Sequence, residues 1–362
     1  IMLSPVLSGE KTIEDIMLHP HTWYSDKGIK FIADDPAVKI DRTRKTVHTE
    51  KGESVDYDRL IIATGSKPFI PPVQGVDLKG VISFRDIYDV NTMIKYCETK
   101  KNAVVIGGGL LGLEAAYGLK QRGMNVTVLH LMDRIMERQL DGRASRMLRQ
   151  SIEEKGINII TEANTEALIG KDGHVNQVRL KDGTVLDADL VVFAVGIRPN
   201  ITLAQSAGLR CNRGILVNNT MQTFDPSIYA VGECIEHRNQ TFGLVEPLWG
   251  QAFICATHLA EHGSLTFKSP TVPTQLKVSG VDVFSAGNFE PKEDYEDIIL
   301  NDEKRQIYKR IIIQKDKVIG AVLFGDTEDG MWYAELIADQ TPISTFRNKL
   351  LFGKDFAMKK AG

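Results

Sequence analysis

A glycine-rich stretch, VVIGGGLLGLEAAYGL at residues 104–119, limits most strongly what this chain can fold into. An apolar run enters three consecutive glycines, and Gly112 completes the spacing G-x-G-x-x-G before a helical pattern of apolar residues. A second apolar run, residues 125–130, follows the turn at Arg122-Gly123. Strand, glycine turn, helix and strand in this order predict a βαβ unit with a dinucleotide pyrophosphate at the helix N-terminus. The order of the elements disfavours the alternative, a purely structural glycine turn.

Each glycine of this turn has a separate expected task. Gly107 permits the tight turn, Gly109 lets a phosphate approach the backbone, and Gly112 lets helix and strand pack closely. The pyrophosphate is expected on the backbone of Gly109, Leu110 and Leu111, where the helix begins.

The second strand ends at His130, where an NAD site commonly has an acidic residue that accepts the ribose hydroxyls. A neutral histidine could hydrogen-bond the ribose, and a protonated histidine together with Arg134 could hold a 2′-phosphate. A solvated strand-end histidine without such a role is an equal alternative. The sequence therefore leaves the choice between NADH and NADPH open.

Length and composition exclude several classes of protein. A chain of 362 residues is too long for one ordinary core and suggests two or three domains. Charged residues make up 25% and the net charge is only -3, so no nucleic-acid footprint is expected. No apolar run reaches the ~18 residues needed to cross a membrane, and the opening IMLSPVLSGEKT is unlike a secretory signal.

The four cysteines give no redox or metal chemistry. They are far apart, with no CxxC and no Cys/His ligand cluster, which indicates a reducing, cytoplasmic setting. We therefore expect no thiol redox pair, no iron–sulfur cluster, no zinc site and no other bound metal. The cysteines are Cys97, Cys211, Cys234 and Cys255.

A strand that ends in a glycine turn occurs twice more. DRLIIATGSKP at 58–68 and DADLVVFAVGIRPN at 187–200 both have a polar start, an apolar strand and an exit through proline. A third short strand, IYAVGEC at 228–234, ends in Gly-Glu. The repeated strand and glycine turn suggest two nucleotide-binding domains of similar structure, one for each of two dinucleotides.

This order of motifs resembles the two-dinucleotide-binding-domain flavoproteins, the relatives of rubredoxin, ferredoxin and disulfide reductases. RIMERQLD at 134–141, GIRPN at 196–200, YAVGECIEHR at 229–238 and GLVEPLWGQA at 243–252 resemble one subgroup in particular. It comprises the flavin modules of assimilatory nitrite reductase large subunits and the electron-transfer subunits of assimilatory nitrate reductase. The resemblance runs over nearly the whole chain and implies FAD and NAD(P)H as cofactors.

The resemblance implies a role for individual residues. Glu233 would hydrogen-bond the FAD ribityl chain, and the backbone near Leu248 and Trp249 would meet the flavin pyrimidine edge, although Trp249 is alternatively a core aromatic. Glu114 would help to shape the nicotinamide site, or is a surface carboxylate favoured by the helix dipole. No side chain is expected to be catalytic, because hydride passes directly between the cofactors. The expected FAD residues are Thr64, Gly65, Ser66, Arg85, Gly232, Glu233, Leu248 and Trp249, and the expected NAD(P) residues are Gly107, Gly109, Leu110, Leu111, Gly112, Glu114, His130, Val195 and Gly196.

The implied fold class is α/β, with two Rossmann-like domains and a small α+β domain at the C-terminus. An NAD(P)H-binding domain, 90–214, is inserted into an FAD-binding domain, 1–89 and 215–262, and 263–362 form a packing or dimer module. The individual elements expected are strands at 38–40 and 45–48, a helix at 250–262, a linker at 263–273, and strands at 275–289, 306–314 and 318–324 with a hairpin turn at 315–317.

Two departures from the family bear on the flavin. The family opens with a strand and a G-x-G-x-x-G that holds the FAD pyrophosphate, whereas this sequence opens on a stretch that relatives place roughly two strands later. A truncated FAD domain with weak FAD binding is therefore expected. Rubredoxin-reductase relatives also carry a lysine near the flavin after Leu-Ser, and here Leu3-Ser4 is followed by Pro5.

The function implied is that of an NAD(P)H-dependent FAD oxidoreductase in nitrite or nitrate assimilation. It would pass electrons to a redox partner protein, or to iron–sulfur and sirohaem domains missing from this sequence. A rubredoxin-type reductase or NADH oxidase is the alternative among enzymes, and a non-catalytic nucleotide-binding module is the alternative of another class. Neither nucleic acid nor membrane is an expected partner, and a homodimer stays open.

Overall fold

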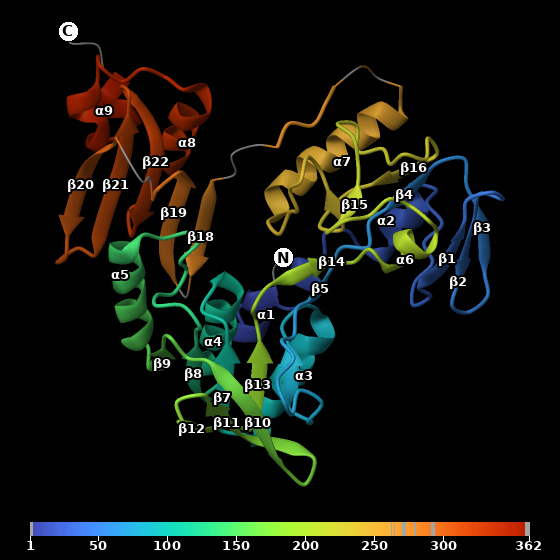
Figure 1. Ribbon diagram of the computed structural model, residues 1–362, viewed down its shortest axis with the longest axis horizontal. Helices are drawn as coiled ribbons and strands as arrows, with labels where there is room; N and C mark the ends of the chain where they lie inside the picture. Colours follow the sequence, from blue (N-terminus) through green and yellow to red (C-terminus); the bar gives the residue numbers. More distant parts are fainter. Residues whose placement is uncertain are drawn as a thin grey trace. The chain divides into compact units, whose positions relative to one another are not determined.

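The chain forms two compact units in the computed structural model (Figure 1). The breaks between them, at residues 69/70 and 195/196, fall earlier than the predicted domain boundaries at 89/90 and 214/215, and the domain assignment stays a prediction. The first unit contains Thr12–Phe69 and Gly196–Pro270, and the second contains Met2–Lys11, Ile70–Val195 and Thr271–Gly362. The structure describes residues 3–261, 263, 265–269, 273–278, 280–290 and 294–358.

A five-stranded parallel sheet, with strand order β6-β13-β7-β8-β9, forms the centre of the second unit. β7 has the sequence NAVVI with its last four residues buried, as expected for a parallel strand covered on both faces. The predicted strand–helix–strand unit is confirmed, because α4 connects β7 to β8 and these two strands pair in parallel. The strands are β6 (Val81–Ser83), β7 (Asn102–Ile106), β8 (Asn125–Leu129), β9 (Ile157–Ile160) and β13 (Leu190–Phe193); the helices are α3 (Ile87–Thr99), α4 (Leu110–Gln121) and α5 (Gly142–Glu153); an antiparallel sheet contains β10 (Thr165–Lys171), β11 (His174–Leu180) and β12 (Val185–Asp187).

Helix α4 packs against the sheet and also against α1 (Leu3–Ser8), which explains its small residues. A Cβ added at Gly118 would lie 2.7 Å from Cγ of the fully buried Leu7. The guanidinium of Arg122, at the end of α4, donates to the carbonyl of Val6 at 3.2 Å. The start of the described chain is therefore anchored to this helix.

The first unit contains short strands and one long helix. Its parallel pair, β4 and β16, contributes Ile62, Ile228 and Ala230 to a buried apolar cluster. The predicted strands at 38–40 and 45–48 are confirmed as two strands of an antiparallel sheet. The elements are η1 (Glu14–Ile16), α2 (His21–Asp26), β1 (Ala37–Asp41), β2 (Thr46–Thr49), β3 (Ser54–Asp56), β4 (Leu60–Ile62), β5 (Ser66–Pro68), β14 (Ile197–Pro199), α6 (Thr202–Ser206), β15 (Ile215–Leu216), β16 (Ile228–Ala230), β17 (Ile235–Glu236) and α7 (Val245–Leu259).

Helix α7 begins five residues before the predicted start at Gly250 and ends at Leu259. Pro247 lies in its first turn, where a missing N–H costs no intrahelical hydrogen bond, so this proline did not mark a boundary. The predicted end at His262, and part of the predicted linker 263–273, lie outside the described residues. Across the described ranges, no helix has both the length and the apolar character that a bilayer crossing requires.

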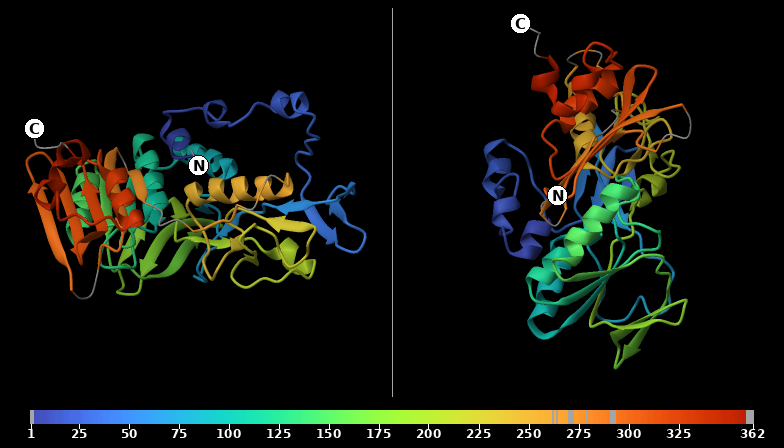
Figure 2. Two further views of the ribbon diagram at one scale, coloured as in Figure 1. Left: turned by 90° about the horizontal axis from the view of Figure 1, so that it is seen from above. Right: turned by 90° about the vertical axis from the view of Figure 1, so that its left-hand side faces the viewer.

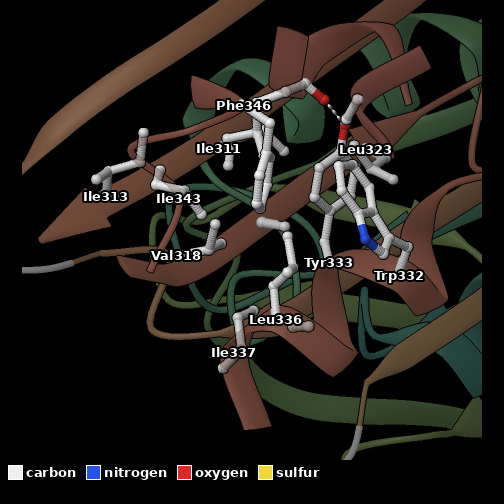
Figure 3. Packing of buried hydrophobic residues seen from close by; sticks show 14 of the residues in the cluster. Ile311, Ile313, Val318, Leu323, Trp332, Tyr333, Leu336, Ile337, Ile343 and Phe346 are labelled. Atoms are coloured by element: carbon white, nitrogen blue, oxygen red, sulfur yellow. Dashed lines mark hydrogen bonds between the residues drawn. The ribbon is translucent and has the colours of Figure 1, made fainter. Parts of the chain in front are cut away.

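An antiparallel sheet with the order β18-β19-β22-β21-β20 forms the C-terminal part of the second unit (Figure 2). Trp332, Tyr333 and Leu336 of α8 pack onto this sheet in a closed apolar core, where the Tyr333 hydroxyl donates to the carbonyl of Leu350 at 2.8 Å (Figure 3). The elements are β18 (Thr274–Val278), β19 (Val281–Gly287), β20 (Glu296–Asp302), β21 (Ile307–Gln314), β22 (Lys317–Phe324), α8 (Gly330–Asp339), η2 (Arg347–Phe352) and α9 (Lys354–Met358).

The predicted strands of this part are confirmed at 306–314 and 318–324, including the hairpin between them. The prediction of one strand over 275–289 is wrong, because β18 and β19 are two antiparallel strands. Gly280 lies between them with a φ of +84°, a left-handed conformation that ends an extended strand. The strand β20 was not predicted.

One buried carboxylate, Asp141, ties the C-terminal sheet to the parallel-sheet part of the same unit. Its Oδ1 accepts the N–H of Ala144 at 2.9 Å and so caps α5. Its Oδ2 accepts from the Tyr308 hydroxyl at 2.8 Å and from the Arg310 guanidinium at 3.2 Å. Both partners lie on β21, so a single side chain fixes the start of a helix and holds a strand.

Candidate functional site

The glycine loop, Gly107–Gly112, has the backbone geometry expected of a pyrophosphate cradle. Gly107 has a φ of +124°, and a Cβ there would lie 2.3 Å from the carbonyl oxygen of Ala194. A Cβ at Gly112 would lie 1.9 Å from the carbonyl oxygen of Gly107, so neither position accepts a side chain. These contacts match the expected tasks of a tight turn and of close helix–strand packing.

Gly109 differs from these two glycines, because the space around it is open. It is the N-cap of α4 with extended φ and ψ of -83° and 180°, and no side chain of the described residues caps it. A Cβ added there would meet no described heavy atom within 4 Å. The start of α4, where the N–H groups of Leu110 and Leu111 have no intrahelical acceptor, is therefore not obstructed at Gly109, as the predicted pyrophosphate contact requires; that contact stays a prediction.

His130 follows β8 and is held at both ring nitrogens. Its Nδ1 accepts the N–H of Gly108 at 3.0 Å, so the ring proton lies on Nε2, which faces a carboxylate oxygen of Glu137 at 3.1 Å. The residue is 9% exposed, so it is not the solvated strand-end histidine of the third alternative. Arg134, its suggested partner for a 2′-phosphate, contacts Glu290 at 2.5 Å. A ribose contact of His130 itself stays a prediction.

Glu114 is half-buried on α4 and accepts a hydrogen bond from the hydroxyl of Ser4 at 2.5 Å. Burial raises the pKa of the Glu114 carboxyl, and the Ser4 hydrogen bond opposes that shift in part. The surface carboxylate considered from the sequence is therefore not what the structure shows. Ser4, the residue before the Pro5 that stands in place of the family's lysine, is the direct hydrogen-bond partner of this glutamate.

The last two predicted nicotinamide residues follow β13. Val195 lies at the glycine loop, because a Cβ on Gly107 would be 3.3 Å from its backbone nitrogen. Gly196 has a φ of +108° and its carbonyl accepts the N–H of Phe69 at 2.9 Å, in the first unit. The structure therefore brings Val195 to the glycine loop, whereas Gly196 is grouped with the first unit and its role at the nicotinamide site stays a prediction.

Five of the eight predicted flavin residues follow the paired strands β4 and β16 of the first unit: Thr64, Gly65, Ser66, Gly232 and Glu233. The Ser66 hydroxyl donates to Glu233 at 2.8 Å, and Glu233 is 9% exposed. Thr64 donates its hydroxyl to the carbonyl of Asn200 at 2.7 Å. Gly65 lies between the two predicted hydroxyl residues with a φ of +63°. Because parallel strands place their carboxyl ends at one edge, the two predicted turns meet there.

Gln251, a residue that the sequence reasoning missed, joins this edge to α7. It is fully buried, and its side-chain oxygen accepts the N–H of Gly232 at 2.8 Å. Its amide nitrogen has no hydrogen-bond partner among the described residues. A buried donor without a partner beside the candidate flavin edge fits a polar cofactor there. The signal in the sequence was a glutamine directly before the apolar helical run AFICA, within the motif GLVEPLWGQA.

Leu248 and Trp249 are the fourth and fifth residues of α7, not its start. Val245 and Glu246 are instead the residues whose N–H groups precede any intrahelical bond. Trp249 is 62% exposed, so the alternative of a core aromatic is wrong. Arg85 belongs to the second unit, where its N–H donates to Asp89 at 2.6 Å.

Cys234, next to Glu233, is a packing residue by its surroundings. It is buried, and burial raises the pKa of its thiol, which leaves it protonated at neutral pH. Cys97, Cys211 and Cys255 also have thiol pKa values raised by burial, and all four are free. An activated thiol is therefore not present among the chain's cysteines.

Known proteins resemble the chain over nearly its whole length. It is 48% identical over 344 residues to a nitrite reductase [NAD(P)H] of Bacillus subtilis (strain 168), covering 95% of this chain and 43% of that protein. It is 40% identical to the assimilatory nitrate reductase electron transfer subunit of the same organism, covering 97% and 45%. The chain thus spans less than half the length of these two relatives.

The fold agrees with that of solved flavoprotein reductases. The structure of an NAD-dependent persulfide reductase from A. fulgidus superposes with a TM-score of 0.87 at 28% identity, over 96% of this chain and 71% of that one. The predicted α/β fold class is thereby confirmed. Residues 273–341 match the rubredoxin NAD+ reductase C-terminal domain. Residues 1–252 match the pyridine nucleotide-disulphide oxidoreductase family, and the chain belongs to that family.

Proposed function

We propose that this chain is the NAD(P)H-dependent flavoprotein module of an electron-transfer system in nitrite or nitrate assimilation. NAD(P)H binds at the glycine loop, FAD binds at the carboxyl ends of β4 and β16, and electrons pass to another redox centre. The two Bacillus subtilis relatives support this assignment. The observation that carries it is the uncapped N-terminus of α4, whose open space at Gly109 suits a pyrophosphate.

The residues of the chain bind and orient the two cofactors. Ser66 donates to Glu233, whose carboxylate would hydrogen-bond the ribityl chain of FAD, and Gln251 holds Gly232 in the adjoining turn. The N-terminus of α7 (Val245–Leu259) would present its positive dipole end to the flavin pyrimidine edge and stabilise the negative charge that develops there on reduction. FAD, when bound, supplies the conversion between hydride transfer and single-electron transfer.

The electron acceptor is a partner protein, or a further iron–sulfur or sirohaem domain in the same polypeptide. Reduction of nitrite requires a metal centre, and the four cysteines of this sequence lie too far apart to bind an iron–sulfur cluster. The protein works in the cytoplasm in this proposal, alone or as a homodimer.

A rubredoxin-type reductase is the second candidate, and one observation favours it. Residues 273–341 match the C-terminal domain of rubredoxin NAD+ reductase. Against this candidate, Pro5 stands where the rubredoxin branch has a lysine, directly after Ser4, whose hydroxyl is hydrogen-bonded to Glu114.

Anaerobic titration of the purified, FAD-reconstituted chain with NADH and NADPH tests the proposal. We expect bleaching of the flavin absorbance, rapid ferricyanide reduction, and no consumption of nitrite or nitrate. A rubredoxin-type reductase would reduce added rubredoxin at a rate comparable to ferricyanide. A protein that binds no FAD under any condition would point to the non-catalytic nucleotide-binding module. NADH-dependent nitrite consumption by the metal-free chain would contradict the proposal that nitrite is reduced at another redox centre.

A further inference from the structure

The segment that follows β8 folds back onto the glycine loop and holds it from two sides. Gly108 donates its N–H to Nδ1 of His130 at 3.0 Å, and its carbonyl accepts the N–H of Met136 at 3.0 Å. Met136 has a φ of +53°, and Ile135 and Met136 are almost completely buried. A Cβ at Gly108 would lie 2.8 Å from Cγ of His130 and 2.9 Å from a methyl carbon of Ile135. The position of this segment is therefore fixed relative to the loop.

Glu137 is the next residue of this segment, and it connects the buried histidine to the surface. Its Oε2 lies 3.1 Å from Nε2 of His130, while its side chain is 24% exposed. Its Oε1 is 3.8 Å from the guanidinium of Arg138, whose side chain is 86% exposed. A contact of that length to a solvated arginine is weak, so Oε1 can accept a further hydrogen bond.

A dinucleotide on the glycine loop places its adenosine ribose near the end of the second strand, where an acidic residue commonly accepts the ribose hydroxyls. His130 stands at that end, but both of its ring nitrogens are already used within the protein. The carboxylate that His130 orients is Glu137. The other cations of this segment are Arg138, whose guanidinium lies 3.8 Å from Glu137, and Arg134, which is paired with Glu290 and Asp133.

We infer that Glu137 determines the choice of nicotinamide cofactor: its carboxylate accepts the ribose hydroxyl of NADH and repels the 2′-phosphate of NADPH. His130 is a positioning residue that orients Glu137 and fixes Gly108. The inference rests on the proposed function, because it requires a nicotinamide dinucleotide on the glycine loop. The sequence left the choice between NADH and NADPH open, and this inference predicts a preference for NADH.

The test measures binding of ADP-ribose and of 2′-phospho-ADP-ribose to the full chain by isothermal titration calorimetry. These fragments contain the adenosine ribose but no nicotinamide, so neither FAD nor turnover is needed. We expect the wild type to bind ADP-ribose at least about tenfold more tightly, since a charge-assisted hydrogen bond is exchanged for repulsion. Glu137→Gln keeps an oxygen for His130 but removes the charge, and should lower this ratio about tenfold.

Glu154→Gln at the end of α5 is the matched control, because it removes one exposed negative charge from the same unit away from the glycine loop, and it should leave the ratio unchanged. His130→Ala should weaken both ligands by a similar factor, through Gly108, with a smaller change in their ratio than Glu137→Gln gives. Nitrogen-15 NMR of the wild type should show the His130 proton on Nε2.

Three outcomes would overturn the inference. An unchanged ratio in Glu137→Gln shows that its carboxylate does not meet the ribose. A larger ratio change in His130→Ala than in Glu137→Gln shows that the histidine makes the contact itself. Both of these results leave the proposed nicotinamide site intact, provided that the wild type binds both fragments. If the wild type binds neither fragment, the proposed nicotinamide site is overturned together with the inference.

Discussion

Replacing Gly109 by valine separates ligand binding from folding more cleanly than any other change in the glycine loop. The residue has an extended backbone with a φ of -83°, which valine adopts readily, and its Cβ would enter open space. The free energy of unfolding should therefore change by less than about 0.5 kcal/mol. The same side chain would occupy the space through which the pyrophosphate reaches the N–H groups of Leu110 and Leu111.

The expected loss of affinity follows from those donors. A hydrogen bond to a charged group contributes about 1.5–3 kcal/mol, so losing two weakens NADH binding by about 3–6 kcal/mol, or at least 100-fold. Calorimetric titration with NADH measures this, and thermal unfolding of the same sample measures stability. Gly112→Ala is the contrasting variant, because its Cβ would lie 1.9 Å from the Gly107 carbonyl oxygen, and it should lower the stability by several kcal/mol, roughly the cost of overpacking or more.

Two results would refute this reasoning. A Gly109→Val protein that melts like the wild type and binds NADH equally well would show that the pyrophosphate lies elsewhere. A Gly109→Val protein as destabilised as Gly112→Ala would show that the space at Gly109 is not open.

Three further predictions concern the supporting contacts. Gln251→Leu leaves the N–H of Gly232 without its acceptor, so urea unfolding should show a loss of about 1–3 kcal/mol, and an unchanged midpoint would contradict the contact. Burial raises the pKa of the Tyr308 hydroxyl above its usual value of 10.0, so the folded state retains the proton more strongly; its stabilising effect is complete below pH 10 and is lost as the pH rises further. Tyr308→Phe should therefore reduce the decline of the unfolding free energy between pH 9 and about 11.5, and an identical pH profile would argue against it. Ser4→Ala removes the hydrogen bond that lowers the pKa of Glu114, so a carbon-13 NMR titration should place that pKa higher than in the wild type; a lower value would contradict the assignment.

Local rules in the sequence were sufficient for the central part of the fold. The strand, glycine turn, helix and strand at 103–130 each follow from residue type and spacing within the segment itself, and they form as predicted. The hairpin at 315–317 was found in the same way, because Lys315 and Asp316 adopt left-handed conformations that a two-residue turn requires. Such features depend on few contacts with the rest of the chain.

The parts that were missed depend on residues far apart in the sequence. No local sequence pattern predicts that Gly108 hydrogen-bonds to His130, 22 residues later, or that Glu137 contacts the other ring nitrogen of His130. The role of Gln251 depends on its hydrogen bond to Gly232, which forms only where α7 packs against the turn after β16. The strand β20 has an exposed face and alternates weakly, so its existence depends on pairing with β21.

The shared carboxylate of Asp141 has a consequence for how this protein can be taken apart and recombined. Because the same side chain caps α5 and accepts from β21, removing the C-terminal sheet would leave a helix start exposed and one carboxylate oxygen without its donors. The two parts should therefore melt together in a single calorimetric transition. A chimaera that exchanges the C-terminal sheet with that of a relative must keep a tyrosine and an arginine in the register of Tyr308 and Arg310, or it loses the coupling between the parts.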